Sequence, residues 1–303
     1  MRRSKFKRAA TRLARAIVLF ECALVAVLSL VITAPAISAQ GSVSSSQLTP
    51  LQFEIEKQRR RLASTETEER RDAVVRLGAM KRADSSRVAA NGLHDPASIV
   101  RATAARAILS LPSEEAAQLL LPLLQDREEF VRQETAYALG LTRSRTAVSA
   151  LVNILEQDKK DSVRGAAAVA LGQIGDESAT IPLTKYLGRS VPASGFLNRV
   201  RRRKKDENEF VRRAAAHSLG QIRSRAAVPA LVDVLRDERA PDDVRREAAI
   251  SLGLIGGQEA ISALRVMLAA RDPYLSEIAY ESLLKISPED ATRPTVSSGN
   301  KAR

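Results

Sequence analysis

One short pattern recurs along this chain and keeps its phase over more than a hundred residues. It reads FVRQETAYALG at 130–140, SVRGAAAVALG at 162–172, FVRRAAAHSLG at 210–220 and DVRREAAISLG at 243–253. Weaker copies lie at 69–78, from Ile99 onward, and at 274–286. A unit this short cannot bury its own apolar face, so the repeat predicts a solenoid in which each unit packs on its neighbours.

The arginine of the repeated Val-Arg pair marks the length of the unit. We call these residues the arginine ladder: Arg101, Arg132, Arg164, Arg212 and Arg245. Their spacings are 31, 32, 48 and 33 residues, so the third interval is 16 residues longer than the second. Arginine suits forked, partly buried ion pairs. We therefore expect a structural ladder that pairs with acids near helix starts, such as Asp161, Glu209 or Asp243, rather than a phosphate-binding stripe.

Each unit has a second half that also shows helical spacing. Seven residues after each repeated glycine, an alanine begins another apolar pattern; these residues are Ala147, Ala179, Ala227 and Ala260. The chain has 3% aromatic residues and no tryptophan, so its apolar residues are mostly small aliphatic ones, which suit closely packed helices. The unit is predicted to be a helix, a turn and a second helix, with the repeated glycine ending the first helix.

The full pattern, Val-Arg-x-x-Ala-x-x-Ala-Leu-Gly-x-Ile-Gly, resembles the HEAT-like repeat of the phycobiliprotein lyases. The resemblance covers about 69–286, and 161–176 is the segment that matches it best. It implies an all-α fold, an α-α superhelix of the HEAT/armadillo type with about six to seven two-helix repeats. The first helices would lie outside and the second helices would line a concave face.

The N-terminus has the order of a secretory signal. Residues 1–15 are basic, 16–32 form an apolar run that contains Glu21, and small residues follow up to Ala39. We predict a signal peptide at 1–39, cleaved after Ala39. The alternative is an uncleaved anchor through residues 16–32, although a carboxylate at bilayer depth is costly. Either way we expect an exported bacterial protein, periplasmic or secreted, or one anchored in the inner membrane.

The remaining chain divides into a core and its flanks. Residues 40–68 are predicted to be a linker and an N-terminal capping helix, 69–286 the solenoid, and 287–303 a disordered tail. If the signal is cleaved, the single cysteine, Cys22, is lost and the mature protein has no thiol.

The long interval of the ladder corresponds to a basic insertion at 188–208. Its basic run consists of Arg199, Arg201, Arg202, Arg203, Lys204 and Lys205. The run fits a solvated loop, or contact with an anionic surface, either membrane lipid or an acidic partner. Nucleic acid is disfavoured, because no aromatic residues interleave the run for base stacking.

Nothing in the sequence indicates an enzyme. The two histidines, His94 and His217, belong to different repeats, and we expect His217 to be a packing residue. The related deoxyhypusine hydroxylases bind iron through His-Glu pairs, and this chain has no such pair. We therefore expect no catalytic residues, no metal site and no cofactor.

The predicted function is a non-enzymatic protein–protein interaction scaffold or adaptor in the cell envelope. It would bind a protein partner on the concave face, through residues such as Asn153, Glu156, Lys185 and Asp233, and through the basic insertion. One alternative is a membrane-tethered structural spacer with the basic loop on anionic lipid. Another is a lyase-like protein that handles a chromophore or cofactor.

Overall fold

A computed structural model describes residues 48–188, 190–192 and 204–291. The predicted signal segment, most of the linker, most of the tail and Arg199, Arg201, Arg202 and Arg203 lie outside the described residues. All elements below belong to one compact unit, Pro50–Arg303.

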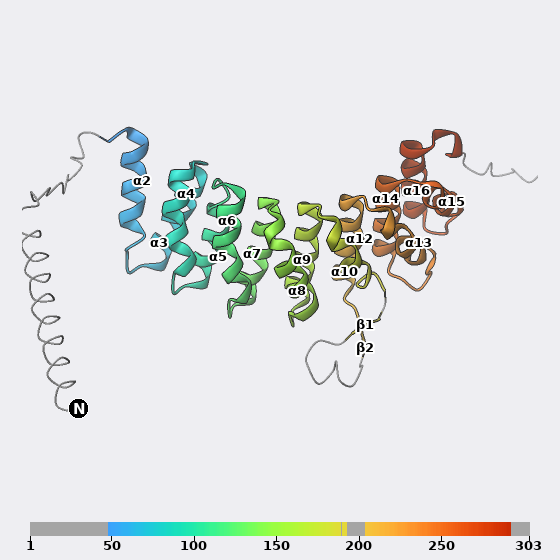
Figure 1. Ribbon diagram of the computed structural model, residues 1–303, viewed down its shortest axis with the longest axis horizontal. Helices are drawn as coiled ribbons and strands as arrows, with labels where there is room; N and C mark the ends of the chain where they lie inside the picture. The colour runs from blue at the N-terminus through green and yellow to red at the C-terminus, as the bar shows by residue number, and fades with distance from the viewer. Residues whose placement is uncertain (1–47, 189, 193–203, 292–303) are drawn as a thin grey trace, which may run out of the picture. The chain divides into compact units, whose positions relative to one another are not determined.

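The described residues form helical pairs that follow one another along the chain (Figure 1). The first helices are α3 (Thr67–Ala79), α5 (Ser98–Ala107), α7 (Glu129–Thr142), α9 (Asp161–Ile174), α12 (Glu209–Ile222), α14 (Asp242–Ile255) and α16 (Pro273–Ile286). The second helices are α4 (Ala83–Ala89) with η2 (Ala90–His94), α6 (Ser113–Leu120) with η3 (Leu121–Gln125), η4 (Arg145–Ala147) with α8 (Val148–Gln157), η5 (Glu177–Ala179) with α10 (Thr180–Thr184), η6 (Arg225–Ala227) with α13 (Val228–Arg236), and α15 (Gln258–Met267). We number the pairs repeats 1 to 6, and α16 begins repeat 7.

Three further elements complete the described chain. Helix α2 (Pro50–Arg61) precedes repeat 1 and packs on α3 and α4, and the short helix η7 (Pro288–Asp290) follows α16. Strands β1 (Ser190–Pro192) and β2 (Lys204–Asp206) pair antiparallel inside the insertion, with Val191 opposite Lys205. The predicted all-α solenoid of the HEAT/armadillo type is confirmed, and a short ribbon is added where only a loop was expected.

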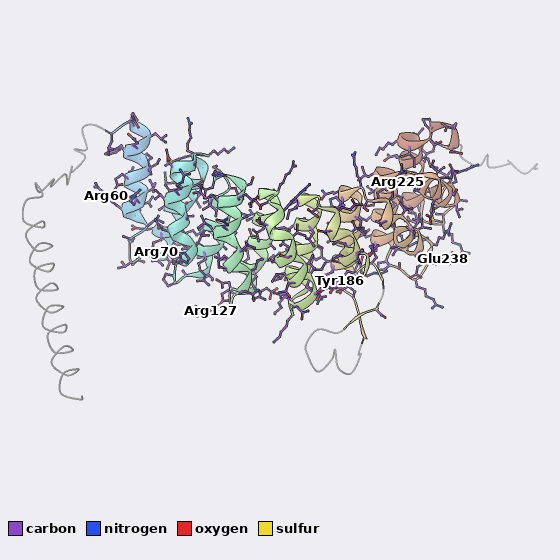
Figure 2. All side chains as sticks on the ribbon, viewed as in Figure 1. Arg60, Arg70, Arg127, Tyr186, Arg225 and Glu238 are labelled. Carbon is purple, nitrogen blue, oxygen red and sulfur yellow. The ribbon has the colours of Figure 1, made fainter. Side chains whose placement is uncertain are left out.

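Each first helix packs on the first helix of the next repeat, and one continuous core runs from Ile55 to Leu283. The links from a second helix to the next first helix and the turns inside a repeat lie at opposite edges of this stack. Figure 2 shows Arg127 in a link at one edge and Arg225, at the start of the second helix of repeat 5, at the other edge. The insertion replaces the link between repeats 4 and 5, so it leaves the solenoid at the link edge.

We had expected the repeated glycine to end the first helix, but it does not. It lies in the last helical turn, where the next first helix comes too close for a side chain. A Cβ added to Gly140 would lie 2.7 Å from Cα of Ala170, and one added to Gly253 would lie 2.7 Å from Cβ of Ser282. Ser218 and Ser251 hold the same contact in repeats 5 and 6 by donating to carbonyls of the preceding first helix, each at 2.8 Å.

In five of the described repeats, the turn that ends the first helix contains a residue with a positive φ. Gly175 and Gly256 take this conformation in repeats 4 and 6, with φ of 73° and 74°. In repeats 1, 3 and 5 the position is occupied by Lys81, Arg143 and Arg223, with φ of 51–59°. A side chain in this region costs about 1–2 kcal/mol, which glycine avoids.

The glycine contact generates a prediction about stability. Glycine to alanine inside a helix normally stabilises by about 0.5–1 kcal/mol. We expect Gly140→Ala to do the opposite and to lower the free energy of unfolding by about 1–3 kcal/mol, because the new methyl group meets the backbone of α9. Urea unfolding followed by circular dichroism measures the change. The control is Gln221→Ala on the exposed face of α12; a stabilised Gly140→Ala protein would contradict the proposed contact.

Candidate functional site

The links between repeats hold a repeated charged cluster. Arg101 donates from Nε and Nη2 to the two carboxylate oxygens of Asp126, at 2.7 and 2.9 Å. Its Nη1 donates to the carbonyl of Asp95 at 2.8 Å. Arg132 repeats this geometry one unit later, with the carboxylate of Asp158 and the carbonyl of Asp126. Each arginine thus joins the link before its own helix to the link after it.

The aspartates of these clusters also shape the backbone. Asp95, Asp126 and Asp158 each accept a hydrogen bond from the backbone N–H two residues on, at 2.9 Å. The guanidinium of Arg70 lowers the pKa of Asp95, and this effect outweighs burial, which acts in the other direction. The carboxylate of Asp95 therefore stays charged, and the carboxylates of Asp95, Asp126 and Asp158 all bond groups of the protein itself.

The expected partners of the ladder need correction. The acids lie 25 or 26 residues after their arginine, at the end of the second helix, and not at helix starts. Of the acids that we had expected to pair with it, Asp161 bonds the ladder residue Arg164 at 2.8 Å, and Asp243 bonds Arg246, the neighbour of the ladder residue Arg245, at 3.0 Å. In the sequence, a link aspartate follows the last apolar turn of a second helix, and this position could have pointed to it. Which acid pairs with the arginine, the link aspartate or an acid at a helix start, depends on how far the arginine side chain reaches.

The membership of the ladder also changes. Arg70 pairs with Asp95 in repeat 1, although the sequence analysis did not include it. In repeat 6, Arg246 forms the forked pair with Asp272, whereas the predicted member, Arg245, donates to the carbonyl of Leu235. The repeat places Arg245 in phase with the other ladder arginines and Arg246 one position later, so the periodicity pointed to the wrong one of the two.

The insertion is attached to the solenoid at both of its ends. Arg212 donates from Nε to the carbonyl of Leu187, at 2.9 Å, just before the insertion. Just after β2, Glu207 forms an ion pair with Arg164. The side chain of Arg164 is 2% exposed and that of Glu207 is fully buried, so this is a buried charge pair. Glu207 therefore takes the role that a link aspartate has in the other repeats.

The basic run itself is described only at its end. Lys204 and Lys205 belong to β2, opposite Pro192 and Val191. Tyr186 lies buried beside the start of the insertion (Figure 2). Burial, with the nearby charges of Glu156 and Glu207, raises the pKa of Tyr186 to about 12, so its hydroxyl stays neutral.

The second helices present a mostly polar outer face. Asn153, Lys185 and Asp233 are exposed there, and Glu156, half-buried, pairs with Lys185 at 3.7 Å. A cavity of about 400 Å³ opens where this face meets the link edge, and Asn153, Lys159 and Lys160 are among its lining residues. These positions are on helices α8, α10 and α13 or just beyond them.

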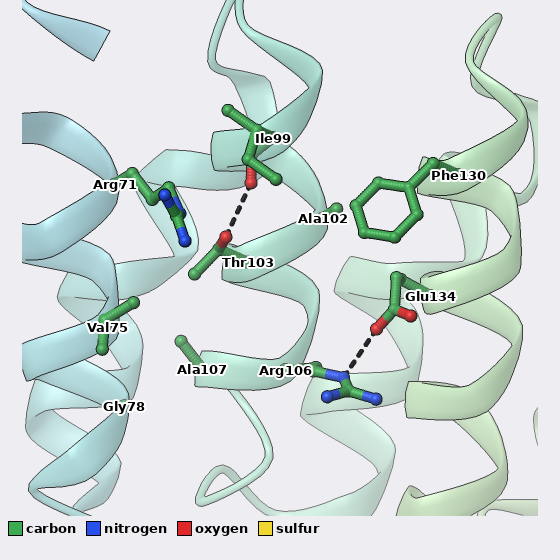
Figure 3. Close-up of a pocket in the computed structure, with 10 residues that line it drawn as sticks. All are labelled: Arg71, Val75, Gly78, Ile99, Ala102, Thr103, Arg106, Ala107, Phe130 and Glu134. Carbon is green, nitrogen blue, oxygen red and sulfur yellow. Dashed lines mark hydrogen bonds and ion pairs between the residues drawn. The ribbon is translucent and has the colours of Figure 1, made fainter. Parts of the chain in front are cut away.

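A second hollow lies among the first helices of repeats 1 to 3 (Figure 3). It has a volume of about 450 Å³ and is lined by residues from α3, α5 and α7. Figure 3 shows Val75 and Phe130 on opposite sides of it, with Thr103 between them. The sequence pattern does not reveal this site, because the site depends on the lengths of side chains on three neighbouring helices.

The histidines do not form a ligand set. We had expected His217 to be a packing residue, but it is not. Its side chain is 43% exposed, and Nδ1 lies 2.8 Å from the carboxylate of Glu247. Among the described residues, no group of three His, Cys, Asp or Glu side chains could hold a metal ion. Within the same residues, no helix is long and apolar enough to cross a membrane.

The buried pair at the end of the insertion predicts a large effect on stability. Glu207→Gln leaves Arg164 buried with only Asp161 as a charged partner. Since breaking a buried pair leaves an uncompensated charge, we expect a loss of about 3 kcal/mol in the free energy of unfolding. Urea unfolding measures this loss. Glu209→Gln, two residues away and exposed, should change stability by at most about 0.5 kcal/mol, and equal effects of the two variants would refute the assignment.

The pair of His217 and Glu247 predicts a pH dependence. The hydrogen bond to Glu247 raises the pKa of His217, and its contribution is larger than the opposing effect of burial. A raised histidine pKa adds stability that is fully present below about pH 6.5 and is lost as the pH rises through the folded pKa.

NMR titration of the imidazole measures this pKa directly. In a His94→Gln background, which leaves one histidine, we expect a midpoint above about 6.5. Glu247→Gln should move the midpoint down. A midpoint that stays the same in the two proteins would show that the carboxylate does not hold the imidazolium.

Comparison with known proteins places this geometry in a family. The HEAT repeats family model matches residues 56–140, 124–195 and 191–242, and the PBS lyase HEAT-like repeat model matches 244–269. No curated protein matches the sequence.

Three solved structures are similar to this chain at low identity. YIBA of Escherichia coli is 20% identical with a TM-score of 0.52, over 78% of this chain and 81% of that one. The complex of CpcE and CpcF of phycocyanin lyase from Nostoc sp. PCC7120 is 24% identical with a TM-score of 0.46, over 79% and 88%. Human deoxyhypusine hydroxylase is 20% identical with a TM-score of 0.37, over 76% and 83%. Because the family models cover well over half of the sequence, the chain belongs to the HEAT-repeat proteins.

Proposed function

We propose that this chain is a non-enzymatic scaffold of the cell envelope that binds a protein partner on the exposed face of its second helices, the face that the HEAT resemblance expects to be concave. The observation that carries the proposal is the face formed by α8, α10 and α13. Its exposed side chains, Asn153, Lys185 and Asp233, differ in chemistry from repeat to repeat, while the core beneath them repeats. A core that repeats beneath a surface that varies from repeat to repeat suits the binding of a protein, whose surface charges also vary, better than the binding of a uniform polymer.

The envelope location is part of the proposal and rests on the sequence of residues 1–39. N-terminal sequencing of the protein from soluble and membrane envelope fractions tests it. A mature chain that begins at Gln40 supports export with cleavage. A chain that keeps residues 16–32 in the membrane fraction supports the anchored form, and a cytoplasmic protein with an intact N-terminus contradicts both.

The binding face is tested by cross-linking in cells that express the full chain. We expect the combined substitutions Asn153→Arg, Lys185→Glu and Asp233→Arg to reduce recovery of the specific cross-linked partner by about tenfold or more, because they reverse or add charge at the centre of the face. All three side chains are exposed, so the fold should be kept. Circular dichroism and thermal unfolding check this.

The matched control changes charge on first helices instead. Gln221→Arg, Glu281→Arg and Lys285→Glu are also exposed substitutions, on α12 and α16. Recovery of the same partner should be unaffected by this control. If the two triple variants recover the partner equally well, the second-helix face does not carry recognition.

A second candidate function is a membrane-tethered spacer whose insertion contacts anionic lipid. It is favoured by the six basic residues within 199–205. Each would contribute about 1 kcal/mol near an anionic leaflet. Vesicles of phosphatidylglycerol and of phosphatidylcholine distinguish this function: selective sedimentation with the anionic vesicles, lost when Arg199, Arg201, Arg202 and Arg203 are changed to glutamine, supports the spacer.

A further inference from the structure

The hollow on the first helices of repeats 1 to 3 has a floor of small side chains. Ala102, Thr103 and Ala107 of α5 and Gly78 of α3 lie at its base (Figure 3). At the positions that correspond to Ala102 and Thr103, repeat 3 has Gln133 and Glu134, and repeat 6 has Arg246 and Glu247. The side chains on the outer face of α5 therefore extend less far into solvent than those at the same positions of repeats 3 and 6. This difference creates the hollow.

The walls of the hollow leave apolar surface in water. Val75 on α3 and Phe130 on α7 are each 48% exposed, and Ile99 completes the apolar lining. Phe210, at the same position of the repeat as Phe130, lies over Gly165 and is more deeply buried. The exposure of Phe130 is thus specific to this part of the array. Exposed apolar side chains around a concave surface are typical of binding sites.

The lining of the hollow has one more basic than acidic side chain, with Arg71 and Arg106 against Glu134. Arg106 pairs with Glu134 at 2.6 Å on one side, which neutralises the only acid of the lining. Arg71 lies on the other side, and its ion pair with Glu68, at 2.9 Å, is exposed to solvent and screened. An occupant with an acidic group next to an apolar one would meet complementary charge at Arg71 and complementary surface at Val75 and Phe130.

We propose that this hollow is a second protein-docking site, which receives an apolar side chain of a partner flanked by an acidic residue. The inference rests on the proposed scaffold function and adds to it a site on the first helices, separate from the second-helix face. A peptide segment fits better than lipid, because the apolar lining is confined to one hollow of about 450 Å³ between charged side chains. An aromatic or aliphatic anchor in such a hollow is the usual centre of a protein interface.

Saturation-transfer NMR with two peptides tests the site on the full chain. The probe is acetyl-Glu-Phe-Leu-Glu-amide, and its charge-reversed partner is acetyl-Lys-Phe-Leu-Lys-amide. We expect the acidic peptide to bind about fivefold more tightly or better, because of the basic rim. Arg71→Gln should reduce this preference without abolishing binding, since the apolar lining stays in place.

A filled-site variant locates the binding. Thr103 lies at the base of the hollow, so the phenyl ring of Thr103→Phe should occupy the hollow and weaken the acidic peptide by about tenfold or more. The matched control is Gln221→Phe, which exposes the same ring on α12 and should leave binding unchanged. Thermal unfolding of the two variants confirms that both are folded.

Three outcomes would overturn the proposal: no binding of the acidic peptide, equal binding of the two peptides, or equal effects of Thr103→Phe and Gln221→Phe. The triple variant of the second-helix face separates this site from the proposed function. It should bind the acidic peptide normally even though it loses the cross-linked partner. A hollow that fails these tests leaves the second-helix face as the single proposed docking surface.

Discussion

The frame of the solenoid depends on arginines that reach across a link to an acid of the next link, as Arg101, Arg132 and Arg164 do. Because Arg101 and Arg132 bind a carboxylate ahead of them and a carbonyl behind them, each fixes the position of two links at once. A buried guanidinium without its acid is costly, so no link can shift without its neighbour. The insertion obeys the same constraint, since Glu207 supplies the acid that its link would otherwise lack.

Much of the fold could be predicted from the sequence, because the repeat encodes helix length and core spacing directly. The phase of the arginines and the apolar positions indicated paired helices over 69–286, and the structure has them there. The roles of single residues were harder. The glycines were read as helix ends, but they lie where two helices approach each other, and such a contact involves residues about 30 positions apart, such as Gly140 and Ala170.

The surface features were the hardest to predict, because they depend on how the side chains of neighbouring helices are arranged relative to one another. The pairing of Arg246 rather than Arg245 with Asp272 is decided by the direction of each side chain at the link, which periodicity does not encode. The hollow at Thr103 results from the small side chains on α5, which lie between Val75 and Phe130. These features distinguish one HEAT-repeat protein from another, whereas the shared pattern accounts only for the frame on which they sit.

The last first helix of the described chain, α16, lacks the repeated glycine. Leu284 occupies the position that Gly253 has in repeat 6, and Ser276 occupies that of Arg245. Ser282 comes within 2.7 Å of a Cβ built on Gly253, so the isobutyl group of Leu284 blocks an equally close approach to α16. Any further contact on that side of α16 must therefore differ from the glycine contact that joins α14 to α16, as the contact between α5 and α7 already does, where Leu109 stands at the glycine position.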